Sequence, residues 1–275
     1  MHILEIIEIA LVGIFSDSEL SKQLVLKGGA ALHFFEKIDE RLSTDVDFSS
    51  RMGLQEKERF FDRLQHILTQ AFEEHGLDLI DFKYQRRPRE SRDRPDWWGG
   101  WLSGFKLSPH ADRKLSPEKR RKQALIPQGT PSSVINIEIS DHEYVGRTRH
   151  TTIKGVKING YSRALLVVEK LRAVCQQHPD YPYRGKKNRT RDLVDIYHLT
   201  KDHQTEGFLE ECKRELPKSF AAKEVDVGFL KALYDEAFVE MLRDGFPQVK
   251  DTLKGSAYPF ETYLEYVRML ISKIS

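Results

Sequence analysis

The apolar residues of this 275-residue chain change their spacing near residue 160. Before that point, segments with the two-residue period of a strand alternate with segments that have helical spacing. The strand-type segments are residues 45–48, 77–84, 101–107, 134–139 and 151–158, and the helical ones are residues 3–22, 30–37 and 55–75. After residue 160 the spacing is helical, in residues 162–177, 191–203, 206–214, 226–243 and 259–274. The sequence therefore predicts an α+β domain over residues 1–160 and an all-helical domain over residues 161–275.

Composition and charge exclude several classes of protein. Hydrophobic residues make up 39% of the chain, which is enough to bury a core, and the net charge of +2 does not by itself indicate nucleic-acid binding. Cys175 and Cys212 have no Cys or His at metal-ligand spacing, so we expect both to be buried and reduced. No apolar run approaches the ~20 residues that span a bilayer, and acidic residues interrupt the N-terminal apolar helix. We therefore predict a soluble, cytoplasmic protein with no membrane partner.

Two glycines, Gly28 and Gly29, separate a short apolar segment from the helix over residues 30–37. Glycines let the backbone approach a bulky anion, and the N-terminus of the helix that follows presents free N–H groups to phosphate. A glycine pair is also a common turn, so this segment taken alone supports either interpretation.

Three carboxylates lie on the predicted strands. Asp45 and Asp47 are two residues apart on one strand and project from the same face, where a cation such as Mg²⁺ would relieve their repulsion. Glu138 lies between Ile137 and Ile139 in the most apolar strand and would complete a three-carboxylate site. Such a site polarises an α-phosphate and lowers the pKa of an attacking hydroxyl. The alternatives are a solvated strand edge for the aspartates and a solvent-facing side chain for Glu138.

The order of these segments resembles one known family. The stretch LVLKGGAALHFFEKIDERLSTDVDFSS is similar to the first motif of the AbiEii/AbiGii-type nucleotidyltransferase toxins, a family with MenT-like members. That family belongs to the DNA polymerase β-like nucleotidyltransferase superfamily. The strand INIEIS resembles its second motif, and VVEKLRAVCQQHPDYPYRGKKNRTRDLVDIYHL resembles its third and fourth. The tract WWGGWLSGFKL is similar to an aromatic-glycine strand of some members.

The resemblance implies a polymerase β-like domain, with a mixed sheet flanked by helices, and a helical domain that completes the NTP cleft. It implies that the catalytic residues are Asp45, Asp47, Glu138, Lys170 and Asp192, and that the first three bind Mg²⁺ or Mn²⁺. It implies that the substrate NTP is bound by Lys27, Gly28, Gly29, Arg41, Ser43 and Arg191. Two positions depart from the family pattern: Ala30 replaces the usual Thr or Ser, and Glu138 replaces a common Asp.

The residues of the helical part have structural interpretations as well. Lys170 lies beside the apolar stripe of its helix and would reach either a triphosphate or a nearby acid at the surface. Asp192 and Asp195 are i, i+3 neighbours on one helix face. Asp192 lies near the start of that helix, where a carboxylate also acts as a cap.

Three stretches rich in Lys and Arg would form a phosphate track for RNA or, alternatively, solvated loops: residues 83–94, 113–122 and 184–191. Three tryptophans either stack a base or pack in the core: Trp97, Trp98 and Trp101. With the resemblance, these features predict nucleotide transfer to RNA, with tRNA as the first candidate. The enzyme would be the toxin of a toxin–antitoxin or abortive-infection system and would have a cognate antitoxin. The alternatives are nucleotidylation of a protein or a small hydroxyl compound, and a non-catalytic NTP-binding module.

Overall fold

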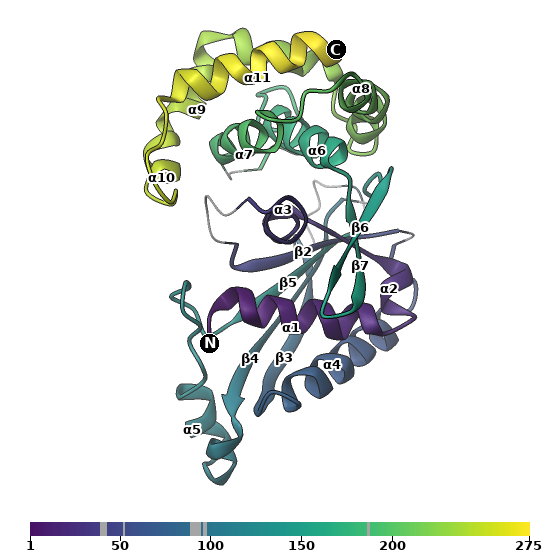
Figure 1. Ribbon diagram of the computed structural model, residues 1–275, viewed down its shortest axis with the longest axis vertical. Coiled ribbons are helices and arrows are strands. Elements are labelled where there is room, and N and C mark those ends of the chain that lie inside the picture. Colours follow the sequence, from purple (N-terminus) through teal and green to yellow (C-terminus); the bar gives the residue numbers. More distant parts are fainter. Residues whose placement is uncertain (39–42, 52, 89–94, 96–97, 186–187) are drawn as a thin grey trace. The chain divides into compact units, whose positions relative to one another are not determined.

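The computed structural model describes residues 1–38, 43–51, 53–88, 95, 98–185 and 188–275. The chain forms two compact units (Figure 1). The first comprises Met1–Phe35 and Leu42–Gly160, and the second comprises Glu36–Arg41 and Tyr161–Ser275. Glu36 belongs to the second unit, and its buried carboxylate pairs with Arg163 of the same unit, at an Oε2–Nη2 distance of 2.5 Å.

The first unit is built on a mixed sheet, which has seven strands among the described residues, in the order β3-β4-β5-β2-β1-β7-β6. The strands are β1 (Leu24–Lys27), β2 (Asp45–Ser50), β3 (Leu77–Arg87), β4 (Gly100–Pro109), β5 (Ile135–Ser140), β6 (Thr148–Ile153) and β7 (Val156–Tyr161). Strand β2 is antiparallel to β1 and parallel to β5. Strand β4 is antiparallel to both β5 and β3.

One face of this sheet is apolar and packs against two helices, α1 (Ile3–Ser16) and α4 (Lys57–Glu73) (Figure 1). Phe48 of β2 meets Phe15 of α1, with ring centroids 6.1 Å apart. Phe61 of α4 stacks on Tyr84 of β3 at 4.0 Å. Burying an aromatic side chain of this size stabilises a fold by roughly 2–3 kcal/mol. The alternate residues of the same strands therefore face the other side, which carries the polar side chains.

The predicted strand over residues 151–158 is wrong as a single element, because the chain turns back within it. Strands β6 and β7 form a hairpin around Lys154 and Gly155. Both residues have positive φ, 47° and 81°, which suits the two-residue turn that matches the twist of an antiparallel pair. The first unit also contains three short elements: α2 (Leu20–Gln23), η1 (His110–Lys114) and α5 (Pro117–Lys122).

The second unit is helical throughout its described residues after β7. Its elements are α6 (Arg163–Cys175), α7 (Thr190–Thr200), α8 (Glu206–Ala221), η2 (Val227–Tyr234), α9 (Glu236–Asp244), α10 (Phe246–Lys250) and α11 (Phe260–Ile274). The predicted helix over residues 226–243 is broken at Asp235, whose side chain caps α9 by accepting a hydrogen bond from the backbone N–H of Phe238. Burial raises the pKa of the Cys175 and Cys212 thiols to about 12, so both remain protonated. None of the helices described is both long and apolar enough to cross a bilayer.

Candidate active site

The turn between β1 and the next helix, α3 (Gly28–Glu36), packs directly against the side chain of Asp47. Gly28 has a φ of +63°, a conformation that non-glycine residues adopt at a cost. A Cβ atom at this position would lie 2.0 Å from Oδ2 of Asp47. The carboxylate of Asp47 is therefore held directly against the glycine turn and the start of α3. Ala30, which replaces the usual Thr or Ser, is fully buried in this helix.

The predicted carboxylates lie on one face of two neighbouring strands. The register between β2 and β5 pairs Asp45 with Asn136 and Asp47 with Glu138, and paired residues share a face. The Nδ2 atom of Asn136 donates a hydrogen bond to Oδ1 of Asp45, at 3.2 Å. Asp45 and Asp47 are half-buried, whereas Glu138 is exposed. We call Asp45, Asp47, Asn136 and Glu138 the acidic row.

The acidic row supplies the oxygen donors that Mg²⁺ and Mn²⁺ prefer. Its chemistry and the close packing of Asp47 on Gly28 fit a divalent ion held by Asp45 and Asp47. Within the described residues, however, no three His, Cys, Asp or Glu side chains converge on one metal position. The side chain of Glu138 is exposed.

Two predicted phosphate ligands contact protein groups. Lys27 donates through Nζ to Oε2 of Glu143 and to Oγ of Ser140, the latter at 2.9 Å. The same Glu143 oxygen accepts a hydrogen bond from Ser49, at 2.8 Å. Ser43 is buried and donates to the backbone carbonyl of Asp45, at 3.1 Å. Glu143 was missed from the sequence, because it lies outside the strands and has no periodic neighbour that would mark it.

In the helical unit, Lys170 forms a buried ion pair with two aspartates. Its Nζ atom lies 3.0 Å from Oδ1 of Asp192 and 2.5 Å from Oδ2 of Asp195. All three residues are less than 10% exposed, so Lys170 is not a surface lysine. Burial pushes the pKa of Asp192 upward, but the charges of Lys170 and Arg189 outweigh it and hold that pKa below its usual value.

A pocket of about 220 Å³ lies at the start of α7 and is contained within the helical unit. It is lined by Asn188, Arg189, Arg191, Asp192, Gly245, Gln248, Val249 and Thr252. The Oδ2 atom of Asp192 is buried, and no described residue offers it a hydrogen bond. The Nη1 atom of Arg189 lies 3.6 Å from it. The pocket therefore combines two arginines with a carboxylate oxygen that lacks a donor.

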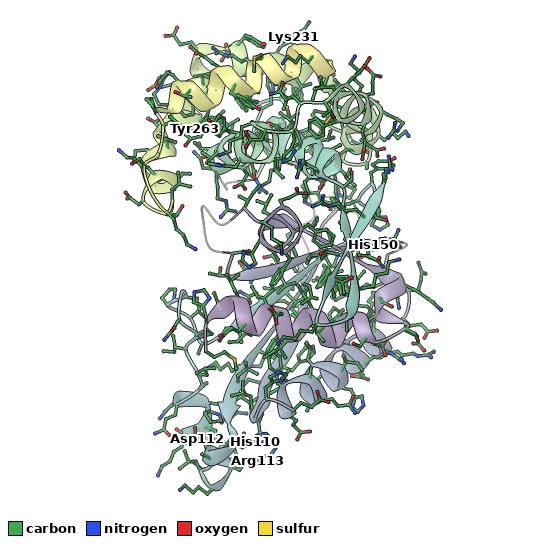
Figure 2. All side chains as sticks on the ribbon, in the orientation of Figure 1. His110, Asp112, Arg113, His150, Lys231 and Tyr263 are labelled. Atoms are coloured by element: carbon green, nitrogen blue, oxygen red, sulfur yellow. The ribbon has the colours of Figure 1, made fainter. Side chains whose placement is uncertain are left out.

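The arginines of the second basic stretch are paired with acids of β3. Arg113 and Arg120 both bind Asp78, each at 2.5 Å, and Arg121 binds Asp81 at 2.7 Å. Figure 2 labels Arg113 beside His110 in η1. The hydrogen bond from Arg113 holds the pKa of Asp78 below its usual value. Asp78 therefore stays ionised and paired with its two arginines.

The remaining predicted residues are placed as follows. Trp101 is half-buried; it packs against Phe61 and donates through Nε1 to Oδ2 of Asp141 at 2.9 Å, so protein contacts hold this tryptophan in place. Arg41, Trp97 and parts of the basic stretches, residues 89–94 and 186–187, lie outside the described residues.

No curated protein matches the chain. Solved structures match at low similarity, as follows. A candidate nucleotidyltransferase from H. pylori has 13% identity and a TM-score of 0.46, over 98% of this chain and 95% of the other. JHP933 from Helicobacter pylori has 13% identity and a TM-score of 0.43, over 98% and 94%. The nucleotidyltransferase toxin MenT4 from Mycobacterium tuberculosis has 14% identity and a TM-score of 0.43, over 98% and 91%.

A family profile matches the sequence itself. The profile described as nucleotidyl transferase AbiEii toxin of type IV toxin–antitoxin systems matches residues 9–266, which is nearly the whole chain. The chain therefore belongs to the AbiEii family of nucleotidyltransferase toxins.

Proposed function

We propose that this nucleotidyltransferase moves a nucleotide from an NTP to a hydroxyl group of RNA, with tRNA as the first candidate acceptor. In this reaction the acceptor oxygen bonds to the α-phosphorus while the bond from that phosphorus to the pyrophosphate oxygen breaks. Pyrophosphate leaves, and the hydroxyl proton passes to a carboxylate.

One observation carries the proposal: the Asp47 carboxylate lies against the Gly28 turn, in register with Glu138 and two residues from Asp45. The turn opens into α3, whose first backbone N–H groups and partial positive charge favour phosphate. Phosphates bound at Gly28 and Gly29 would therefore lie beside the carboxylates. This juxtaposition of an anion site and acids is the arrangement that nucleotidyl transfer requires.

A divalent ion, Mg²⁺ or Mn²⁺, would be held by Asp45 and Asp47 and would neutralise charge on the triphosphate. Glu138 is the exposed acid of the row and is free to turn toward an acceptor hydroxyl or the ion. Ser43 steadies the backbone of Asp45 through its hydrogen bond. The ammonium group of Lys27 donates a hydrogen bond to Glu143. We propose that Lys27 fixes the glycine turn and lies close to the phosphates.

In the helical unit we propose that the pocket at α7 contributes to NTP binding. Arg191 is exposed at its edge and would pair with phosphate oxygens. The buried Oδ2 atom of Asp192 would accept a hydrogen bond from a sugar hydroxyl or a base amino group. Lys170 would hold Asp192 ionised and in place through their ion pair.

The proposed biological role is that of a growth-arresting toxin. The family acts in type IV toxin–antitoxin systems, which implies an antitoxin partner. Two exposed cations of β3, Lys83 and Arg87, lie on the same face of the sheet as the acidic row. Their position supports RNA as the acceptor.

The test is incubation of the purified protein with total RNA, Mg²⁺ and each of the four NTPs labelled at the α-phosphate. We expect one NTP to label an RNA species of tRNA size and to release one pyrophosphate per nucleotide added. Label on protein or on a small compound would replace RNA with the corresponding acceptor. If no NTP yields pyrophosphate, the remaining interpretation is a non-catalytic NTP-binding module.

A further inference from the structure

The face of the sheet that carries the acidic row continues across two more strands. Strand β4 pairs with β5 so that Leu102 lies opposite Glu138 and Gly104 lies opposite Asn136. Strand β3 then pairs with β4 so that Lys83 lies opposite Gly104. The alternate residues on this face of β3 are therefore Lys83, Gln85 and Arg87.

Two cations on this edge are available to a ligand. Lys83 and Arg87 are exposed, and neither has an ion pair or a side-chain hydrogen bond in the part of the chain that the structure describes. They differ in this from Arg113, Arg120 and Arg121, whose guanidinium groups are engaged by the aspartates of β3. Exposed cations without partners bind phosphates without first giving up a protein contact.

Between the acids and the cations, this face of the sheet carries few side chains. The residues of β4 on this face are Gly100, Leu102 and Gly104, and two of the three have no side chain. Leu102 and Gly104 are partly exposed, so this part of β4 is reachable from solvent, whereas Gly100 is buried and a Cβ atom there would lie 2.2 Å from the carbonyl oxygen of Ile139. Strand β3 is two strand spacings from β5 and three from β2, which places the cations ~10–14 Å from the acidic row. A chain of phosphates can therefore lie across β4 with its end at the acids.

We propose that this strip, Lys83 and Arg87 of β3 with the glycine-rich strand β4, binds the phosphate backbone of the acceptor RNA just before its reacting end. The proposal rests on the RNA acceptor proposed above. The end of the acceptor would be single-stranded, because one line of cations matches one backbone rather than two. A protein acceptor would gain little from cations placed at a fixed distance from the reacting hydroxyl.

The test compares two double charge reversals. In the first, Lys83→Glu and Arg87→Glu, both cations of the strip are replaced. The matched control, Lys22→Glu and Lys231→Glu, makes the same charge change at two exposed lysines outside the three basic stretches, for which the described residues provide no side-chain hydrogen bond or ion pair. Binding of labelled bulk tRNA is measured without NTP between 50 and 200 mM salt, chosen to span the range where phosphate contacts dominate. Binding of NTP is measured alongside.

Each phosphate contact to a single strand contributes about 0.7 to the slope of log affinity against log salt. Loss of two contacts should lower the slope by about 1.4 and weaken binding roughly tenfold at 0.15 M salt. We expect this result for the strip variant, with NTP affinity unchanged, and wild-type binding for the control. Equal binding by the strip variant and wild type, or a larger loss in the control, would overturn the placement. A wild-type protein that releases pyrophosphate but neither binds nor labels RNA would instead overturn the proposed acceptor.

Discussion

Replacement of Gly28 by alanine tests the contact on which the site depends. The backbone at Gly28 has a φ of +63°, and an added Cβ atom would lie 2.0 Å from Oδ2, 2.7 Å from Cγ and 2.9 Å from Cβ of Asp47. These separations are shorter than any normal van der Waals contact. Gly28→Ala must therefore move Asp47, the start of α3, or both.

The cost has two parts that can be separated. An alanine in the left-handed region costs about 1–2 kcal/mol, and forcing an extra carbon into a packed position costs about 1–3 kcal/mol more. We expect Gly28→Ala to lower the free energy of unfolding by about 2–5 kcal/mol. Gly155→Ala is the matched control, because Gly155 has a φ of +81° but nothing within 4 Å of an added Cβ. It should lose only the backbone part, about 1–2 kcal/mol.

Urea denaturation gives both free energies, and pyrophosphate release under conditions where each variant is folded gives the activity. A displacement of Asp47 by about 1 Å should lower the rate roughly 100-fold in Gly28→Ala, while Gly155→Ala should retain wild-type activity. Equal stability and equal activity in the two variants would refute the close packing of Asp47 on the turn.

Two buried ion pairs give further predictions. Lys170→Met should lower the free energy of unfolding by about 3–5 kcal/mol in urea, because it leaves Asp192 and Asp195 without their cation; a loss below about 1 kcal/mol would contradict the ion pair. The folded-state pKa of Asp192 is lowered, so its contribution to stability is present above pH ~4 and is lost as pH falls through the lowered value. Lys170→Met should raise that pKa and move acid unfolding to higher pH, as followed by circular dichroism. Glu143→Ala removes the main partner of Lys27 and should lower kcat for pyrophosphate release at least tenfold with partial rescue in Glu143→Gln, whereas wild-type kinetics in both would show that the pair is dispensable.

Local periodicity in the sequence predicted much of the fold. The two-residue period of residues 45–48 and 134–139 predicted strands, and it placed Asp45 and Asp47 on one face, as found. The predicted fold class, family and enzyme class are confirmed by the mixed sheet and the family match. The roles of the site residues stay predictions.

The sequence alone did not predict contacts between segments that are distant along the chain. The hydrogen bond between Asn136 and Asp45 joins residues 91 apart, and periodicity within a strand does not specify its neighbour. The sequence is compatible with a surface position for Lys170, because the burial of a polar side chain becomes evident only once the partner helix is known. The sequence of residues 113–122 predicts a phosphate track or a solvated loop, and its pattern does not reveal that Asp78 binds two of its arginines.

Substitution of the paired aspartates tests the central claim most directly. Pyrophosphate release with Mg²⁺, the preferred NTP and RNA is measured for wild type, Asp45→Asn and Asp47→Asn. The control is Asp62→Asn, which makes the same chemical change at an exposed position of α4. If the acidic row performs nucleotidyl transfer, both row variants should fold normally and lose roughly 100- to 1,000-fold in rate, while Asp62→Asn keeps full activity. Wild-type rates in folded Asp45→Asn and Asp47→Asn would contradict the assignment of this row as the catalytic site.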